Sequence, residues 1–206
     1  MGWTSISSTV TELANGDLQV VSVLRPEVAS PPPPPPTSLL VVDGFDAPLS
    51  GWSTYAGSFR SNLSNLEVGT AGLDLLGRTA EVFPPDQFSE ATIASGTRAD
   101  TQLQVFVRRT GVNRYGFGYL DTGEWYLKYD GGPGAPMMAT VPGPLQVPGD
   151  VLRVEARGSV IIGLRNGVEL LRVTDARLTS GVPGVALASA VAFWTPVFAE
   201  WRGGGF

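Results

Sequence analysis

Along most of the chain, apolar and polar side chains alternate in short segments that Gly and Pro residues interrupt at close intervals. Alternation with a period of two is typical of β-strands, and no stretch sustains the 3.6-residue apolar period of a helix. The pattern therefore predicts an all-β protein, built as an antiparallel two-sheet sandwich or jelly roll. The predicted strands are Leu18–Leu24, Gln102–Arg108, Arg114–Leu120, Glu124–Asp130, Val151–Arg157, Val160–Arg165 and Val168–Thr174.

Three places in the sequence are typical of hairpin turns. In "SVIIGLRNGVELLRVTD" two apolar segments flank Asn166-Gly167, the dipeptide best suited to the positive φ angles of a type I′ turn. In "GYLDTGEWYLKYD" we expect a reversal at residues 121–123, and Asn15-Gly16 indicates a smaller hairpin near the N-terminus.

Six consecutive prolines, Pro31–Pro36, separate a short segment from the rest of the chain. A polyproline II helix rises about 3.1 Å per residue, so the run predicts a semi-rigid stalk of roughly 19 Å. Residues 1–29 are too few to form a core of their own. We therefore predict a docking arm over residues 1–29, a linker over 30–38 and a β-sandwich over 39–206. Alternatively, the run is a ligand for SH3 or WW modules, but the nearest flanking cation is Arg25, six residues before it.

Composition excludes several classes of protein. The 206 residues carry a net charge of −5 with scattered cations, which argues against a nucleic-acid partner. The absence of cysteine excludes disulfides and thiolate metal sites, and the absence of histidine excludes a Ser-His-Asp triad. The N-terminus does not resemble a secretory signal, and the longest apolar runs are too short to span a bilayer. We expect a protein made in the cytoplasm, without membrane insertion.

The main domain carries motifs in a characteristic order. "VDGFDAPLSGW" begins at Val42, and the last third contains "GDVLRVE", then "NGVELLRVTD", "SGVPG" and "FAEWRGG". This order resembles the concanavalin A-like lectin/glucanase superfamily, especially its laminin G-like jelly rolls. The resemblance implies a jelly roll, but the superfamily contains lectins, glycosidases, adhesion modules and virion proteins, so it leaves the function open.

The first residues, "GWTSISSTV", resemble the Trp-containing N-termini of phage tail and virion accessory proteins. The resemblance implies that a small arm attaches to a particle and that the downstream domain projects from it. The apolar residues of the arm that we expect to dock are Trp3, Ile6, Leu18 and Val20.

Retaining glucanases of the superfamily carry acids in the order E-x-D-x-E, and no such triplet occurs here. The nearest groups of acids are Glu81, Asp86 and Glu90, and Asp121 with Glu124. Both groups are more typical of solvated turns, so we predict that the protein is not an enzyme.

Aromatic residues gather in two neighbouring predicted strands. Tyr115 and Phe117 share one face of their strand, and in the next strand Tyr126 and Lys128 lie opposite Trp125. Sugars bind by placing C–H faces on aromatic rings, while polar groups bond the hydroxyls; alternatively, one of these faces is simply core. The candidate ligand-binding residues are Trp125, Tyr126, Lys128, Asp121 and Arg114.

Calcium is the cofactor that the superfamily resemblance implies most readily, through oxygen ligands. Asp43, Asp46 and Glu200 lie in the first and last segments of the domain, which usually neighbour each other in this fold. The alternative is that these acids only keep edge strands soluble. No other cofactor is predicted.

These observations support three hypotheses. The first is a multi-copy, non-enzymatic virion protein, a capsid decoration or tail accessory, whose arm docks on other virion proteins while its jelly roll contacts host glycans. The second is a carbohydrate-binding adhesion module of an extracellular bacterial surface assembly. The third, a carboxylate glycosidase, lacks a recognisable pair of acids.

Overall fold

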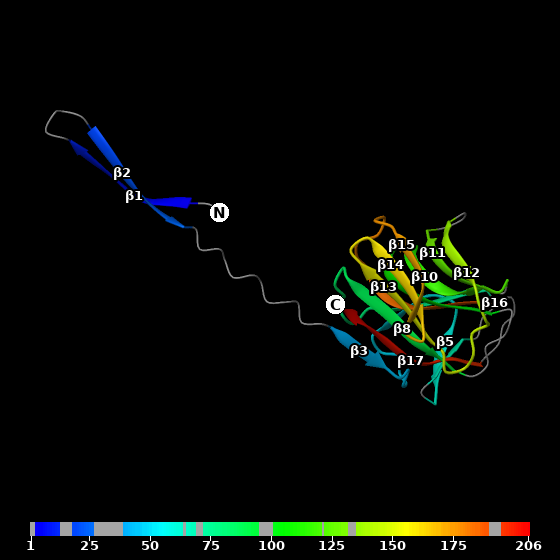
Figure 1. The fold of residues 1–206 in the computed structure, drawn as a ribbon. Coiled ribbons are helices and arrows are strands. Elements are labelled where there is room, and N and C mark those ends of the chain that lie inside the picture. The colour runs from blue at the N-terminus through cyan, green and yellow to red at the C-terminus, as the bar shows by residue number, and fades with distance from the viewer. Residues whose placement is uncertain are drawn as a thin grey trace. The chain divides into compact units, whose positions relative to one another are not determined.

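The computed structural model describes residues 3–12, 18–26, 39–63, 65–68, 72–94, 101–120, 122–131, 135–189 and 195–206. It divides into two units, Met1–Pro36 and Thr37–Phe206 (Figure 1). The predicted linker, residues 30–38, lies outside the described residues, so the predicted domain boundaries stay a prediction. No helix long and apolar enough to cross a membrane occurs in the described ranges.

The described part of the first unit is a pair of antiparallel strands, β1 (Trp3–Glu12) and β2 (Leu18–Pro26). Val10 lies opposite Val20 in this register, as expected for the predicted N-terminal hairpin. The turn residues Asn15 and Gly16 lie outside the described residues. A two-stranded hairpin is marginally stable by itself in water.

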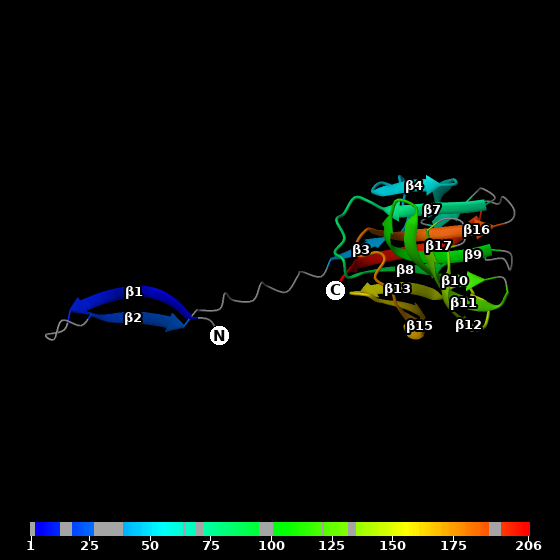
Figure 2. The same cartoon turned by 90° about the horizontal axis from the view of Figure 1, so that it is seen from above.

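The second unit consists of two antiparallel sheets (Figure 2). The seven-stranded sheet has the order β12 (Met137–Pro142), β11 (Glu124–Asp130), β10 (Asn113–Leu120), β9 (Thr101–Thr110), β16 (Val182–Ser189), β7 (Gly72–Arg78) and β4 (Trp52–Ala56). The eight-stranded sheet has the order β15 (Val168–Thr174), β14 (Val160–Arg165), β13 (Val151–Arg157), β8 (Gln87–Ile93), β17 (Thr195–Gly205), β6 (Asn65–Val68) and β5 (Phe59–Asn62), and β3 (Leu40–Asp43) also pairs with β17.

The inner faces of the two sheets form one continuous core. Leu103, Val105 and Val107 on β9 contribute every second side chain of that strand, as the period of two requires. Leu152 and Val154 contribute from β13 in the other sheet, and all five side chains are fully buried. The arrangement confirms the predicted all-β jelly-roll sandwich.

Several predicted strands have the bounds that the pattern indicated. β11, β13, β14 and β15 begin and end where they were predicted, and β9 extends slightly beyond its predicted range at both ends. Asn166 and Gly167 adopt φ angles of 52° and 77°, which confirms the predicted reversal. The alternation was informative here because each of these strands has one buried face.

Trp201 links the two sheets through the core. Its side chain is fully buried, and its Nε1 donates to Ser89 Oγ at 2.9 Å. The Ser89 hydroxyl in turn donates to the carbonyl of Gly184 in the opposite sheet at 2.8 Å. The Trp201 and Trp52 rings also pack edge to face, with their centroids 4.8 Å apart.

We expect the Trp201→Ala substitution to lower the free energy of unfolding by about 3–5 kcal/mol, because it leaves a cavity and removes the donor to Ser89. Urea denaturation of the full chain measures this change. Val82→Ala is the matched control, since Val82 is 95% exposed and its truncation should shift stability by less than about 0.5 kcal/mol. A loss below about 1 kcal/mol at Trp201 would contradict the central role of this link.

Candidate functional site

The outer face of the seven-stranded sheet carries a hollow of about 260 Å³. Small side chains on β16, Ala186 and Ala188, form part of its floor. Its polar lining comes from β9, β10 and β11, and consists of Gln102, Gln104, Arg114, Tyr126, Lys128 and Asp130. Leu73 and Met137 add apolar surface and are partly exposed.

Two glycines allow side chains of neighbouring strands to lie flat on this face. A Cβ at Gly116 would meet the Gln104 amide at 2.1 Å, and one at Gly118 would meet the Tyr126 hydroxyl oxygen at 2.9 Å. The register places Gly116 opposite Lys128 and Gly118 opposite Tyr126. Because of the "YGFGY" spacing, β10 places no side chains on this face at the two glycines. Its aromatic residues point into the core instead.

A hydrogen-bonded network runs across the hollow. Arg114 pairs with Asp130 through its Nη2, and its Nε donates to Gln104 Oε1 at 3.1 Å. The Gln104 Nε2 donates to the Tyr126 hydroxyl at 3.2 Å. Lys128 lies beside this network, with its Nζ 3.5 Å from Asp130 Oδ1.

Burial changes the ionisation of two of these groups. Burial lowers the pKa of Arg114, an effect that the nearby charge of Asp130 opposes. Burial also raises the pKa of the Tyr126 hydroxyl, so this group is a neutral hydrogen-bonding partner at physiological pH. The hollow therefore offers amide, hydroxyl and ammonium groups together with a carboxylate that is already paired.

Three of the five predicted ligand-binding residues meet at the hollow: Arg114, Tyr126 and Lys128. Asp121 lies outside the described residues. Trp125 is only 1% exposed and stacks on Phe117 with ring centroids 5.6 Å apart. Its side of β11 faces the core, and its ring also borders a second hollow together with Arg165 and Val168. Ligand binding by Trp125 therefore stays a prediction.

Tyr126 is also more buried than a stacking platform would be, at 3% exposure. The sequence analysis missed Gln102, Gln104 and Asp130 as members of the site. The signal for these residues in the sequence was weak. Polar side chains at alternate positions of β9 show that one face of the strand is not core, but they do not show which residues of other strands lie beside that face.

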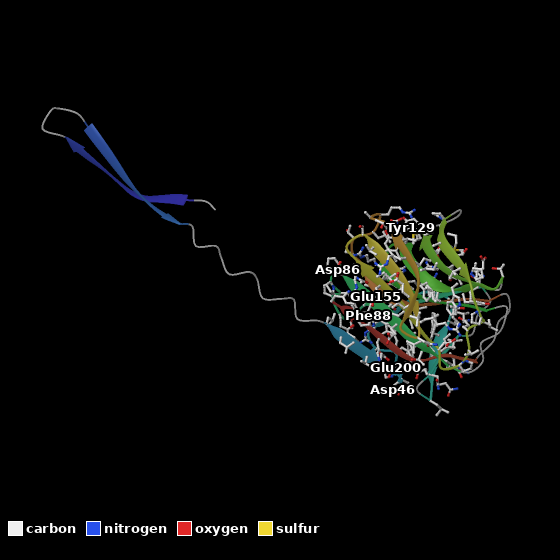
Figure 3. All side chains as sticks on the ribbon, in the orientation of Figure 1. Asp46, Asp86, Phe88, Tyr129, Glu155 and Glu200 are labelled. Carbon is white, nitrogen blue, oxygen red and sulfur yellow. The ribbon has the colours of Figure 1, made fainter. Side chains whose placement is uncertain are left out.

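Of the predicted calcium ligands, Asp43 and Asp46 line one hollow, and β3, which contains Asp43, pairs with β17, which contains Glu200. Asp43 accepts from the backbone nitrogen of Phe45, from Trp52 Nε1 and from Arg78. Glu200 accepts from Arg202, and no group of three or more acidic residues suited to a metal occurs within the described ranges. Figure 3 labels Asp46 and Glu200 on the second unit. Calcium binding by these residues stays a prediction.

The acids considered for catalysis are mostly engaged by arginines. Glu81 pairs with Arg78 at 2.7 Å, and Glu90 pairs with Arg153 at 3.2 Å. In the lining of the hollow, Asp130 is the carboxylate that the described residues supply. The hollow thus does not show the two unpaired carboxylates of a glycosidase among its described residues.

The outer face of the eight-stranded sheet is different in character. It carries charged residues in pairs, such as Arg153 with Glu155 at 2.7 Å, and the Arg153 guanidinium also lies 3.8 Å from the centre of the Phe88 ring. Figure 3 labels Glu155 and Phe88 on this face. Because these charges are mutually paired, this face has the properties of a solvated surface.

No protein-family model matches the chain, and no curated protein sequence is significantly similar to it. Solved structures do share its fold. A carbohydrate-binding module, CBM66 from Bacillus subtilis, has a TM-score of 0.59 at 18% identity, over 71% of this chain and 93% of that one. A prokaryotic β-1,3-1,4-glucanase (lichenase) derived from a mouse hindgut metagenome has a TM-score of 0.58 at 11% identity, over 81% and 98%.

The exoplasmic/lumenal domain of VIP36, in a form bound to Ca²⁺ and Man3GlcNAc, has a TM-score of 0.58 at 9% identity, over 76% of this chain and 83% of that one. These likenesses confirm the concanavalin A-like jelly-roll fold. They include both binding proteins and enzymes, so the fold does not by itself decide between the two activities.

We expect Asp130→Asn to destabilise the protein by about 3 kcal/mol, because the buried guanidinium of Arg114 loses its counter-charge. The double variant Arg114→Met/Asp130→Leu should lose less stability than Asp130→Asn, because it removes both charges. Thermal and urea unfolding measure both changes. Glu169→Gln, which breaks an exposed pair with Arg172 on the other sheet, is the control and should have little effect. A double variant as unstable as the single one would contradict this interpretation.

Proposed function

We propose that the second unit is a non-enzymatic glycan-binding module and that the hollow on its seven-stranded sheet is the binding site. The observation that carries the proposal is the convergence of Gln102, Gln104 and Lys128 on a hollow that apolar side chains, including Leu73 and Met137, also line. Amide groups both donate and accept hydrogen bonds, which suits the hydroxyls of a sugar. The carbohydrate-binding module among the structural neighbours supports the proposal through its shared fold.

The size and lining of the hollow suit a single sugar ring. Its volume of about 260 Å³ lies below the roughly 300–1,000 Å³ of pockets for drug-sized ligands. Leu73 and Met137 give the C–H face of a ring an apolar surface, while the polar side chains lie on the strands beside it. A small, open site of this kind gives weak binding, which many copies on one assembly would strengthen by avidity.

The absence of catalysis follows from the state of Asp130 in this proposal. A glycosidase needs one carboxyl as acid and a second as nucleophile or base, and retaining enzymes hold the two about 5–5.5 Å apart. Asp130 is held by Arg114 and lies beside Lys128. It therefore serves to position the cations of the site, and no proton transfer is assigned to it.

The N-terminal hairpin is proposed to attach this module to a larger assembly. A hairpin of two strands buries too little apolar surface to be stable alone, so a partner sheet or groove would complete it. A virion is the assembly that we favour, with the glycan-binding domain displayed in many copies; a bacterial surface assembly is the alternative. The resemblance of the first residues to virion accessory proteins supports this choice.

A glycan array probed with the full chain tests the binding function, and we expect selective binding to a subset of glycans. Ala188→Trp should lower the affinity for those glycans at least tenfold, because the indole fills the hollow. Thr174→Trp is the control, since Thr174 is exposed on the other sheet, and it should bind normally. Both variants are checked for an unchanged melting temperature. Equal binding by the two variants would show that the hollow is not the site.

Deletion of residues 1–29 tests the proposed attachment. The shortened chain should stay soluble and folded, with the same unfolding transition as the full chain, because the sandwich core lies in the second unit. It should no longer co-purify with particles that incorporate the full chain. Co-purification of the shortened chain at the level of the full chain would refute the role of the hairpin.

A further inference from the structure

Two cations, Arg114 and Lys128, line the hollow, and a third, Arg109, lies on the neighbouring strand outside its lining. Arg109 on β9, Arg114 on β10 and Lys128 on β11 lie on three adjacent strands of the seven-stranded sheet. Asp130 is the carboxylate that the described residues place against them. The other acid on the same side of β11, Glu124, lies at the far end of the strand and accepts from Thr140 at 3.1 Å.

Arg109 contributes a positive charge that no described carboxylate balances. Its guanidinium lies 3.3 Å from the centre of the Tyr55 ring, and no ion pair to it occurs in the described ranges. Its Nε is buried without a hydrogen-bond partner in this part of the chain. Burial lowers the pKa of Arg109, an effect that the neighbouring Tyr55 opposes, and an arginine stays charged in a protein.

Arg109 and Arg114 are cross-strand neighbours. Val107 pairs with Tyr115 and Thr110 pairs with Asn113, so the register shift between these pairs leaves Arg108 and Arg109 together opposite Arg114. The two charges are close enough for Arg109 to lower the pKa of Arg114. Like charges at this spacing destabilise the folded protein unless a counter-ion is available.

Asp130 cannot supply that counter-ion to all three cations. It pairs closely with Arg114 and more loosely with Lys128, at 3.5 Å. Among the described carboxylates, one negative charge therefore faces three positive charges in this part of the sheet. This positive region belongs to a protein whose net charge is −5, so the excess is local and does not reflect a basic surface.

We propose that the hollow binds an acidic sugar, with the anionic group of the sugar beside Lys128 and Arg114, and with the charge of Arg109 on the neighbouring strand adding to the attraction. This inference rests on the proposed function and specifies its ligand class. Arginine and lysine bind carboxylate and sulfate groups through charge-assisted hydrogen bonds, which are about twice as strong as neutral ones. The apolar side chains of Leu73 and Met137 line the same hollow and would contact the sugar ring.

Three matched oligosaccharides test the ligand class by calorimetric titration of the full chain. They are an oligogalacturonate, its methyl ester, which lacks the charges, and a 6-sulfated oligogalactoside of the same length. We expect binding of the oligogalacturonate or the sulfated oligosaccharide. The one that binds more tightly identifies the preferred anionic group, carboxylate or sulfate. The methyl ester should bind at least roughly tenfold more weakly, and added NaCl should lower the affinity for the acidic ligand.

Charge-removing variants then locate the site. Arg109→Gln and Lys128→Gln should each lower the affinity for the acidic ligand roughly tenfold. Both substitutions should leave binding of the methyl ester unchanged. Neither substitution deprives Asp130 of Arg114, so both should fold. Arg172→Gln is the matched control, because Arg172 is exposed on the other sheet and pairs with Glu169; it should bind normally.

Lys128 also offers a direct readout, because it is the chain's single lysine. Acetylation by an amine-reactive ester, followed by mass spectrometry of the peptide that contains Lys128, reports whether the ammonium is covered. A saturating acidic oligosaccharide should slow this acetylation at least several-fold, while the methyl ester should not. The N-terminal amine serves as the internal standard.

The outcomes separate this inference from the proposed function. Equal affinity for the oligogalacturonate and its methyl ester, or unchanged acetylation of Lys128 in the bound state, would overturn the acidic-sugar assignment and leave glycan binding standing. Failure of every charged and neutral glycan to bind would overturn both. Selective binding of an acidic glycan that is lost in both charge variants would establish the assignment.

Discussion

Packing of the two inner sheet faces against each other is the constraint on which the rest of the structure depends. Successive side chains of a strand point to opposite faces of the sheet. When every second residue packs in the core, the residues between them therefore lie on the outer face. Phe117 and Leu127 are fully buried between the sheets. Their neighbours Gly116 and Lys128 consequently lie together on the outside, where they help to form the hollow.

The hollow is as much a product of small residues as of polar ones. Gly116, Gly118 and Ala186 occupy outer positions on adjacent or nearby strands, and none raises a long side chain above the sheet. Gln104 and Tyr126 lie over the glycines and bond to each other, so their polar groups line the floor. A surface of this kind has donors and acceptors in fixed positions, which limits the conformational entropy that a ligand must remove.

Electrostatics gives the two outer faces different roles. On the eight-stranded sheet, Arg153 and Glu155 neutralise each other, so the face presents little net field. On the seven-stranded sheet, Arg109 has a tyrosine ring as its neighbour in place of a carboxylate. An unbalanced, partly desolvated cation costs folding free energy, and such groups are found where charge serves binding.

The amino-acid sequence by itself determined the strands, the reversal at Asn166-Gly167 and the class of fold, because each depends on local alternation and turn chemistry. It also brought Arg114, Tyr126 and Lys128 forward as candidates. Only the tertiary structure decided that the Trp125 side of β11 is core and the Tyr126 side is not, since alternation defines two faces without saying which is buried. Gln104 joined the site, and Arg109 came to lie beside it, for a related reason: strand pairing and a register shift bring these residues beside β10, and neither effect is visible in a single strand.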